Sequence, residues 1–428
     1  MNPVLPLHHR VPDVEARVFD GRLYLYGSYD KDFDTYYCSQ EYHVFSTADL
    51  QEFTDHGICM KAEWTPSPNT LLYAPDCVKI GNTYYLFWAS SCGREWVAQC
   101  ATPTGPFSNV REVHLPVRQI DPAVLVDDDG AVYYYWGQFQ CHAARLLPGL
   151  DAIDPATYQA SLLDEMAHGF HEGASIRKIG GLYYLVYSDV SGGRATRLSY
   201  ATAESPLGPF TKQGAIIDCV DCDPESWNNH GSIVEFNGQW YICYHRSSMC
   251  REGMRRLCME RISLQPDGSI AQVEMTTQGP GTLLQPRTPL PAVYACLLRG
   301  KVRMDRSERY LTRLEDGSGA AYKYFDFAGE DRFGAACASL FAGCRLRVRL
   351  DAWDGEVLGE MMLPCTGGWV TGGIDGFANA TLEHRPVYGR HAVFLEAVCS
   401  ENRFFNLQEF VFWKHNAPGA ETGRQKLQ

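Results

Sequence analysis

Five residues that can do chemistry recur at one position of a repeating pattern: Asp13, Tyr73, Asp121, Glu172 and His230. Each stands eight or nine positions ahead of a glycine, at positions 21, 81, 130, 181 and 238. Three of the five are carboxylic acids. If these acids meet, one can donate a proton while another, ionised, activates water, and hydrolysis of a glycosidic bond needs both roles.

Crowding would also give the three acids different pKa values. Like charges that lie close together raise the pKa of at least one carboxyl group, so a third carboxylate can keep the acid protonated at neutral pH. Aromatic rings near the acids would stack on sugar faces. The candidates are Tyr73, Trp88, Trp136 and Trp227.

The elements that must position these residues are repeated hairpins. Each glycine lies between two apolar stretches, as in "DVEARVFDG" followed by "RLYLYGSYD", and the glycines are 60, 49, 51 and 57 residues apart. Short strands with a period near 50 residues are typical of a β-propeller, here with five blades of four strands. The innermost strands of a propeller run side by side, so the residues that open them should converge at one end of the central channel.

The blade period stops after a stretch rich in Pro, Thr and Gly at 275–293. Longer alternating strands follow, which predicts an antiparallel, jelly-roll-like β-sandwich. We therefore expect an all-β protein with a five-bladed catalytic propeller at 1–285, a sandwich at 286–416 and a flexible tail at 417–428.

The chain resembles glycoside hydrolase family 43, whose catalytic domain is a five-bladed propeller with an inverting mechanism. The matching segments follow the family's order: "VPDVEARVFDGRLYLYGSYD", "LYAPDCVKIGNTYYLFWASS", "IDPAVLVDDDG", "HEGASIRK" and "NNHGSI". The resemblance implies that Asp13 is the general base, that Asp121 orients and tunes the acid, and that Glu172 is the general acid.

The same resemblance assigns two further residues. His230 corresponds to a channel histidine that often lies beside calcium or another ion, and Arg246 to a basic residue that contacts substrate. From the residues alone, His230 is equally a hydrogen-bonded core histidine, and Arg246 can be a plain salt-bridge partner. The family usually has Trp where this chain has Tyr73, which leaves the shape of the sugar subsite open.

The C-terminal part resembles a family 6 carbohydrate-binding module through "LGEMMLPCTGGW", "YGRHAVFLEA" and "NLQEFVFW". Its role is either to bind sugar or to brace the propeller. Trp369 is either a ligand platform or a core residue.

Composition excludes several classes of partner. The chain has 38 basic and 51 acidic residues and a formal charge of −13, without a basic stripe for nucleic acid. The N-terminus lacks a signal-peptide pattern and no stretch has the length of a membrane helix, so we expect a cytoplasmic protein. The 16 cysteines are scattered, which indicates reduced thiols, and the pair Cys219 and Cys222 lacks a second pair for zinc.

These observations together predict an inverting hydrolase that releases a terminal pentose, arabinofuranose or xylose, from plant-type oligosaccharides. No cofactor is expected for the chemistry, with a structural calcium possible in the channel. Three alternatives stay open: another glycon such as galactose or galactofuranose, a retaining fructosidase, and a propeller that binds sugar without catalysis. The oligomeric state is not predicted.

Overall fold

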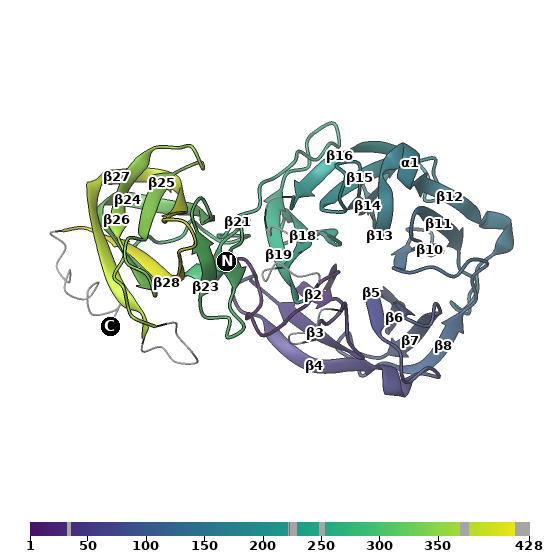
Figure 1. Ribbon diagram of the computed structural model, residues 1–428. Coiled ribbons are helices and arrows are strands. Elements are labelled where there is room, and N and C mark those ends of the chain that lie inside the picture. Colours follow the sequence, from purple (N-terminus) through teal and green to yellow (C-terminus); the bar gives the residue numbers. More distant parts are fainter. Residues whose placement is uncertain (32–35, 221, 223–228, 248–252, 369–375, 416–428) are drawn as a thin grey trace.

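The computed structural model describes residues 1–31, 36–220, 222, 229–247, 253–368 and 376–415. Over these residues the protein is built almost entirely of β-strands, as predicted. Figure 1 shows a ring of blades joined to a separate β-sandwich. Short helical turns, η1 (Ala62–Trp64), η2 (Pro155–Thr157), α1 (Glu165–His168) and η3 (Ala292–Tyr294), lie between strands.

The ring is a five-bladed propeller. Its blades are successive antiparallel sheets in chain order. Blade one holds β1 (Glu15–Phe19), β2 (Arg22–Tyr26), β3 (Glu41–Thr47) and β4 (Thr54–Lys61), and blade two holds β5 (Leu72–Ile80), β6 (Thr83–Ser90), β7 (Glu95–Cys100) and β8 (Ser108–Val113). Blade three holds β9 (Ala123–Val126), β10 (Val132–Trp136), β11 (Gln140–Arg145) and β12 (Gln159–Asp164). Blade four holds β13 (Phe170–Ile179), β14 (Leu182–Asp189), β15 (Arg197–Ala203) and β16 (Thr211–Asp218). Blade five holds β17 (Ser232–Phe236), β18 (Gln239–Ser247) and β19 (Arg255–Ile262).

The predicted hairpins open each blade. In blade one Phe19 pairs with Arg22, which leaves Asp20 and Gly21 as a two-residue loop. Both loop residues have positive φ, 50° and 76°. Two positive φ values define the type I′ turn that fits the twist of a hairpin, and Asp-Gly adopts it readily. The turn glycine is therefore a backbone requirement of the hairpin.

The prediction of four strands in every blade was wrong for blade five, where the described strands number three. The N-terminal segment lies along the outer strand β19 instead. Val4 N–H donates to the Leu257 carbonyl at 3.1 Å, and the Asn2 amide exchanges hydrogen bonds with the Met259 backbone at 2.9 and 3.1 Å. The start of the chain thus covers a strand edge that would otherwise be exposed, and it ties blade five to blade one.

Apolar cores fill the spaces between neighbouring blades. One of them joins blade one to blade five, with Leu25 and Phe45 packed with Val234 and Leu257. Charged side chains link blades one and two: Arg17 donates to both carboxylate oxygens of Asp76 at 3.0 and 2.7 Å. The inner strands β1, β5, β9, β13 and β17 contact one another around the channel.

The C-terminal part is sandwich-like and has its own core. Its strands are β20 (Leu290–Pro291), β21 (Leu297–Arg299), β22 (Arg303–Met304), β23 (Leu311–Glu315), β24 (Gly319–Ala338), β25 (Arg345–Leu350), β26 (Val357–Met362), β27 (Ala378–Val398) and β28 (Phe404–Trp413). The two longest, β24 and β27, pair along most of their length. Register shifts within that pairing let the strands bend.

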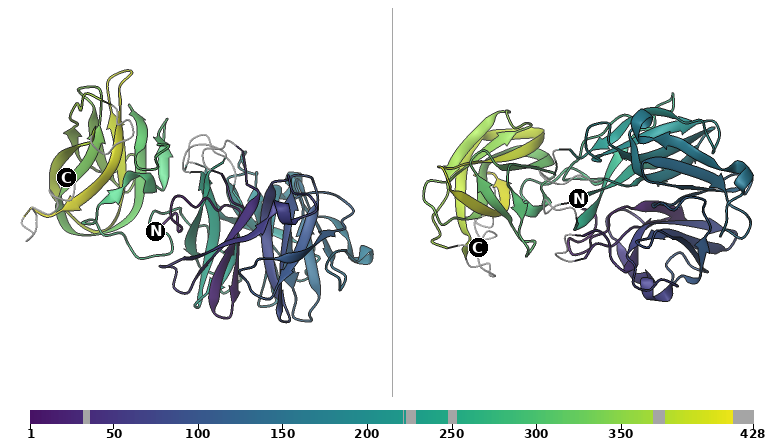
Figure 2. Two further views of the ribbon diagram at one scale, coloured as in Figure 1. Left: turned by 90° about the horizontal axis from the view of Figure 1, so that it is seen from below. Right: turned by 45° about the vertical axis from the view of Figure 1, so that its right-hand side comes forward.

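The propeller and the sandwich lie next to each other in both views of Figure 2. Ion pairs and a hydrogen bond from a side chain to the backbone join them. Arg10 and Arg256 of the propeller both donate to the Glu308 carboxylate. Arg246 donates to the carbonyl of Ala295 at 2.5 Å.

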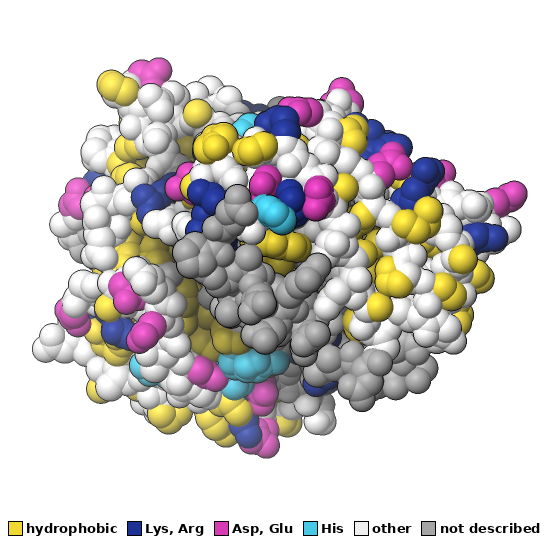
Figure 3. Space-filling model, turned by 90° about the vertical axis from the view of Figure 1, so that its left-hand side faces the viewer, with side chains coloured by type: hydrophobic (Ala, Val, Ile, Leu, Met, Phe, Trp, Pro, Cys, Tyr) yellow, Lys and Arg dark blue, Asp and Glu magenta, His cyan; other side chains and the backbone are white. Residues whose placement is uncertain are grey.

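On the face drawn in Figure 3, basic and acidic side chains are interspersed. Over the described ranges, no helix is long and apolar enough to span a membrane.

Candidate functional site

A cavity of about 310 Å³ lies at one end of the propeller channel, and all five of the recurring residues line it. One comes from the start of each blade, so the structure brings together side chains that are up to 217 positions apart, from 13 to 230. The rest of the lining consists of Tyr36, Tyr37, Cys38, Ala74, Ile120, Gln138 and Arg255.

Several of these residues have a backbone with positive φ, which sets the direction of their side chains. Asp13 and Asp121 both have a left-handed backbone, with φ of 57° and 60°. Such conformations are strained for residues other than glycine and gather at functional sites. Gly173, next to Glu172, also has positive φ, and a Cβ there would come within 2.9 Å of the His230 ring. Glycine therefore lets the strand that carries Glu172 approach His230 closely.

Asp13 is buried but surrounded by cationic or hydrogen-bonding partners. Arg255 Nη1 donates to Asp13 Oδ1 at 2.8 Å, and His245 Nδ1 lies 3.3 Å from the same oxygen. Burial by itself raises the pKa of Asp13, but the charge of Arg255 and the neighbouring imidazoles of His245 and His230 outweigh it and the pKa is lowered. Asp13 is thus an ionised carboxylate at neutral pH, as a base must be.

Asp121 lies in the opposite environment. Burial is the largest cause that raises its pKa well above the ordinary value, followed by the nearby carboxylates of Glu172 and Asp13. Its Oδ2 lies 3.8 Å from His230 Nδ1. Asp121 therefore retains its proton at a higher pH than an exposed aspartate does, and it lies beside the Glu172 carboxyl group.

Glu172 is held by a residue that the sequence did not single out. Gln138 Nε2 donates to Glu172 Oε2 at 2.8 Å. His171 Nε2 lies 4.0 Å from the same oxygen, while its Nδ1 is 2.8 Å from Glu165 Oε1. The side chain of Glu172 is 14% exposed against 7% for Asp121, so Glu172 is the more accessible member of the pair.

His230 lies between two acids rather than in a metal cage. Its Nδ1 is 3.8 Å from both Asp13 Oδ1 and Asp121 Oδ2. Calcium takes six to eight oxygen ligands, whereas the protein offers an imidazole and two carboxylates here. Among the residues that the structure describes, no group of three or more His, Cys, Asp or Glu side chains is arranged to hold a metal ion. These residues do not fit the predicted ion as direct ligands.

The prediction for Arg246 was wrong, because its place in the pocket belongs to Arg255. Successive side chains of a strand point to opposite faces. On β18, His245 faces Asp13, so the next residue, Arg246, points away toward Ala295. Arg255 lies on the neighbouring strand β19 and contacts Asp13 directly.

Trp88 and Trp136, the candidate tryptophans that the structure describes, do not line the cavity. Trp136 and Trp88 are each 0% exposed. Trp136 belongs to the core between blades two and three, where its indole N–H donates to the Val117 carbonyl at 3.0 Å, so the prediction of a sugar contact was wrong. Trp227, like Trp369, lies outside the described residues. The aromatic lining comes instead from Tyr73 and from Tyr36 and Tyr37 in the loop before β3.

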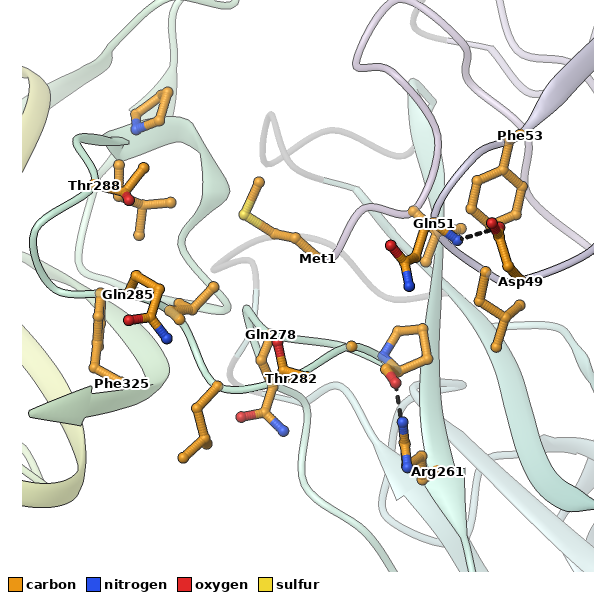
Figure 4. A pocket seen from close by; sticks show the side chains of 18 of the residues that line it. Met1, Asp49, Gln51, Phe53, Arg261, Gln278, Thr282, Gln285, Thr288 and Phe325 are labelled. Carbon is orange, nitrogen blue, oxygen red and sulfur yellow. Dashed lines mark hydrogen bonds between the residues drawn. The ribbon is translucent and has the colours of Figure 1, made fainter.

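A larger cavity of about 580 Å³ lies between the propeller and the sandwich (Figure 4). Its lining is mainly apolar or neutral, with Gln51, Gln278 and Gln285 among the polar residues. The one carboxylate in it, Asp49, accepts hydrogen bonds from the backbone of its own turn at 2.9 and 3.0 Å. The acids needed for hydrolysis are therefore in the smaller cavity.

The cysteines that the structure describes are free thiols, most of them buried. Cys219 and Cys222 lie in one turn, with Cys222 N–H donating to the Cys219 carbonyl at 3.0 Å. Burial raises the pKa of the Cys219 thiol well above its ordinary value. Both residues behave as small buried side chains.

Comparison with known proteins finds one enzyme family and relatives with similar names. The sequence profile of glycosyl hydrolases family 43 matches residues 1–270. A xylosidase/arabinosidase of Thermoclostridium stercorarium is 31% identical in an alignment that covers 86% of this chain and 91% of that protein. Xylosidase/arabinosidase 43A of Humicola insolens is 32% identical, covering 60% of this chain and 95% of that protein.

Solved structures agree. A family 43 β-xylosidase/α-arabinofuranosidase from a compost metagenome, in complex with xylotriose and in a calcium-free form, has a TM-score of 0.57 at 29% identity, covering 64% of this chain and 97% of that chain. An arabinoxylan arabinofuranohydrolase from Bacillus subtilis aligns over 97% of both chains with a TM-score of 0.55, and its 23% identity supports the fold alone. The profile match and the full-length relatives, together with a five-bladed propeller that gathers three acids in one pocket, show that this chain is a glycoside hydrolase and belongs to glycosyl hydrolases family 43.

Proposed function

We propose that this enzyme hydrolyses a terminal glycosidic bond with inversion, with Asp13 as general base, Glu172 as general acid and Asp121 as the residue that tunes the acid. One observation carries the proposal: three acids from different blades line one cavity, and the pKa of Asp13 is lowered while that of Asp121 is raised. Acid and base roles are divided in this way in sites that run both chemistries at neutral pH.

The reaction follows from these roles. Asp13 takes a proton from a water molecule, and the water oxygen forms a bond to the anomeric carbon. The bond from that carbon to the leaving oxygen breaks, and Glu172 gives its proton to the leaving oxygen. Because water attacks the face opposite to the leaving group, the configuration of the anomeric carbon inverts.

Asp121 and Gln138 prepare Glu172 for this step. Glu172 and Asp121 interact, since Glu172 is one of the causes that raise the pKa of Asp121, and Glu172 is the more exposed of the two and faces the leaving group. Gln138 donates to Oε2 of Glu172 and fixes the orientation of the carboxyl group. Arg255 plays the opposite part for Asp13, because its charge favours the ionised base.

The substrate that we propose carries a terminal pentose, α-L-arabinofuranose or β-D-xylose, on an oligosaccharide. Relatives across most of the chain are named for these activities. The cavity of about 310 Å³ is at the small end of the usual range for ligand sites, about 300–1,000 Å³, which suits one sugar and its bond. Tyr73 offers its ring, and burial raises the pKa of its hydroxyl to about 12, so the hydroxyl stays a neutral hydrogen-bonding group.

A panel of nitrophenyl glycosides tests the proposal. We expect turnover of the α-L-arabinofuranoside, the β-D-xylopyranoside or both, and none from the Asp13→Ala variant. Turnover confined to galactosides or galactofuranosides would replace the glycon while keeping the mechanism. Sugar binding by calorimetry without turnover of any glycoside would support a non-catalytic propeller, and retention of configuration would support the fructosidase-like alternative.

We also propose that the propeller ends near residue 285 and that residues 286–416 form a separate module. The parallel pairing of Leu284 with Phe325 and the hydrogen bond from Phe412 N–H to the Pro286 carbonyl support a boundary at this point. Limited proteolysis between 275 and 290 that releases two folded fragments would support the division.

A further inference from the structure

Asp30, outside the cavity, makes an unusually complete set of hydrogen bonds to Arg255. It follows β2 in blade one and is 1% exposed. Its carboxylate accepts from the backbone N–H, Nε and Nη2 of Arg255, each at 2.9 Å. Bidentate pairing of a guanidinium with a carboxylate fixes the plane of the guanidinium.

The orientation that results leaves Arg255 Nη1 directed at the active-site acid. That nitrogen donates to Asp13 Oδ1 at 2.8 Å. One buried guanidinium therefore serves two buried carboxylates, Asp30 through two of its nitrogens and Asp13 through the third. Arg255 Nη2 also donates to Cys38 Sγ at 3.6 Å, so Asp30 is the strongest of several contacts that hold the guanidinium.

Asp30 also holds the loop that contributes tyrosines to the cavity. Cys38 N–H donates to Asp30 Oδ1 at 2.8 Å. The preceding residues, Tyr36 and Tyr37, line the cavity, and the Arg255 guanidinium lies 4.8 Å from the centre of the Tyr37 ring. A single carboxylate thus connects the base, its arginine and the aromatic wall.

We propose that Asp30 is a positioning residue of the active site, which holds Arg255 against Asp13 and moderates the effect of the arginine's charge on that base. This inference rests on the proposed role of Asp13 as general base. Asp30 does not line the cavity, so it acts through Arg255 and not on the substrate.

The charges around Asp13 determine whether its pKa rises or falls when Asp30 is replaced. Arg255 from β19 is the cation that favours its ionised form. His245 from β18 is neutral, because burial lowers its pKa to about 3, and His230 ahead of β17 and Asp121 ahead of β9 also face it, while the charge of Asp30 lies behind Arg255. Asparagine or serine at position 30 can still accept a hydrogen bond from Arg255, so the guanidinium stays beside Asp13, but the negative charge is removed and the full charge of Arg255 acts on Asp13. The pKa of Asp13 should then fall, and a weaker base accepts a proton from water less readily.

Blade four provides a matched control. Asp189 ends β14 and is also 1% exposed. Its Oδ2 accepts from Ser199 Oγ at 2.6 Å and from Lys212 Nζ at 2.9 Å. Asp189 does not line the cavity. It is a buried, ion-paired aspartate at a comparable place in a blade, without a link to Asp13.

The test is the pH dependence of kcat/KM for wild type, Asp30→Asn, Asp30→Ser, Asp30→Glu and Asp189→Asn, on the best substrate of the glycoside panel. For either neutral variant we expect the acid limb to move to lower pH by about one unit and kcat to fall roughly tenfold. Asp30→Glu keeps the charge, so its acid limb should stay near that of wild type. Asp189→Asn should leave the limb in place.

An acid limb that stays at its wild-type position in every folded neutral variant overturns the inference, even if those variants melt at lower temperature. The same holds if Asp189→Asn moves the limb as far as Asp30→Asn. The test can be made with either Asp30→Asn or Asp30→Ser, provided that one of them folds. Near-normal activity of Asp13→Ala is a different result, because it refutes the proposed base itself.

Discussion

Asp13 and Asp121 occupy the same position in two different blades, each two residues ahead of an inner strand and each with left-handed backbone, φ 57° and 60°. Despite this shared geometry, their ionisation differs. The pKa of Asp13 is lowered by Arg255 and two histidines against the effect of burial, while burial and neighbouring acids raise that of Asp121. The repeat places the carboxyl groups, and their neighbours decide the chemistry.

Replacing Asp13 should abolish catalysis without unfolding the protein. Asp13→Asn keeps a residue type that tolerates the left-handed backbone, so we expect a near-normal melting temperature. Without the base, kcat should fall by about 10²–10⁴-fold. Steady-state kinetics and a thermal melt measure both effects. Activity within a few-fold of wild type would eliminate Asp13 as the base.

Glu172→Gln should lose activity in proportion to the need for acid assistance. A nitrophenyl or dinitrophenyl leaving group departs without a proton, whereas a sugar hydroxyl does not. We therefore expect a large loss on an oligosaccharide and a much smaller loss on a dinitrophenyl glycoside. Equal losses on both substrates would show that Glu172 is not the acid.

Asp121→Asn should move the alkaline limb of the pH profile. Glu172 is one of the causes that raise the pKa of Asp121, so the two carboxyl groups titrate together, and asparagine at position 121 removes that coupling. The alkaline limb of kcat/KM should shift downward and the maximal rate should fall. An unchanged limb with reduced rate would mean that Asp121 only positions groups.

Glu95 offers a prediction about stability. This glutamate is 2% exposed, its Oε2 accepts from the Tyr134 hydroxyl, and burial raises its pKa to about 8. The folded state keeps the proton up to about pH 8, while an unfolded glutamate loses it near pH 4.5. Stability from this group is present below pH 4.5 and is lost as pH rises to 8.

Glu95→Gln removes that dependence, since glutamine does not ionise. The variant should gain stability relative to wild type as pH rises from 4.5 to 8, by on the order of 5 kcal/mol at most, with no further gain above pH 8. Chemical unfolding at several pH values measures the difference. A difference that is the same at pH 5 and pH 8 would contradict the pKa of Glu95.

The period of the hairpins was enough to predict the propeller and the residues that open its inner strands. This succeeded because the twist and spacing of blades are set by local turns such as Asp20–Gly21, which the sequence displays. The fourth strand expected in blade five was not found, because the edge of β19 is covered by residues from the other end of the chain.

Residues that reach the pocket from outside the repeat were missed. Arg255 is adjacent to Arg256 in sequence, and only the register of β19 decides which of the two faces Asp13. Gln138 and the two loop tyrosines, Tyr36 and Tyr37, follow strands without any period of their own. The pair "TYYC" ahead of β3 was the one available signal, because adjacent aromatics in a loop near an active-site strand suit sugar binding.

Proton NMR of the sugar released first from a substrate of known anomeric configuration tests the central claim most directly. With Asp13 activating water and Glu172 protonating the leaving oxygen, a β-xyloside should give α-xylose first, before mutarotation. First release of β-xylose would show retention, and the assignment of Asp13 as a base that activates water would be wrong.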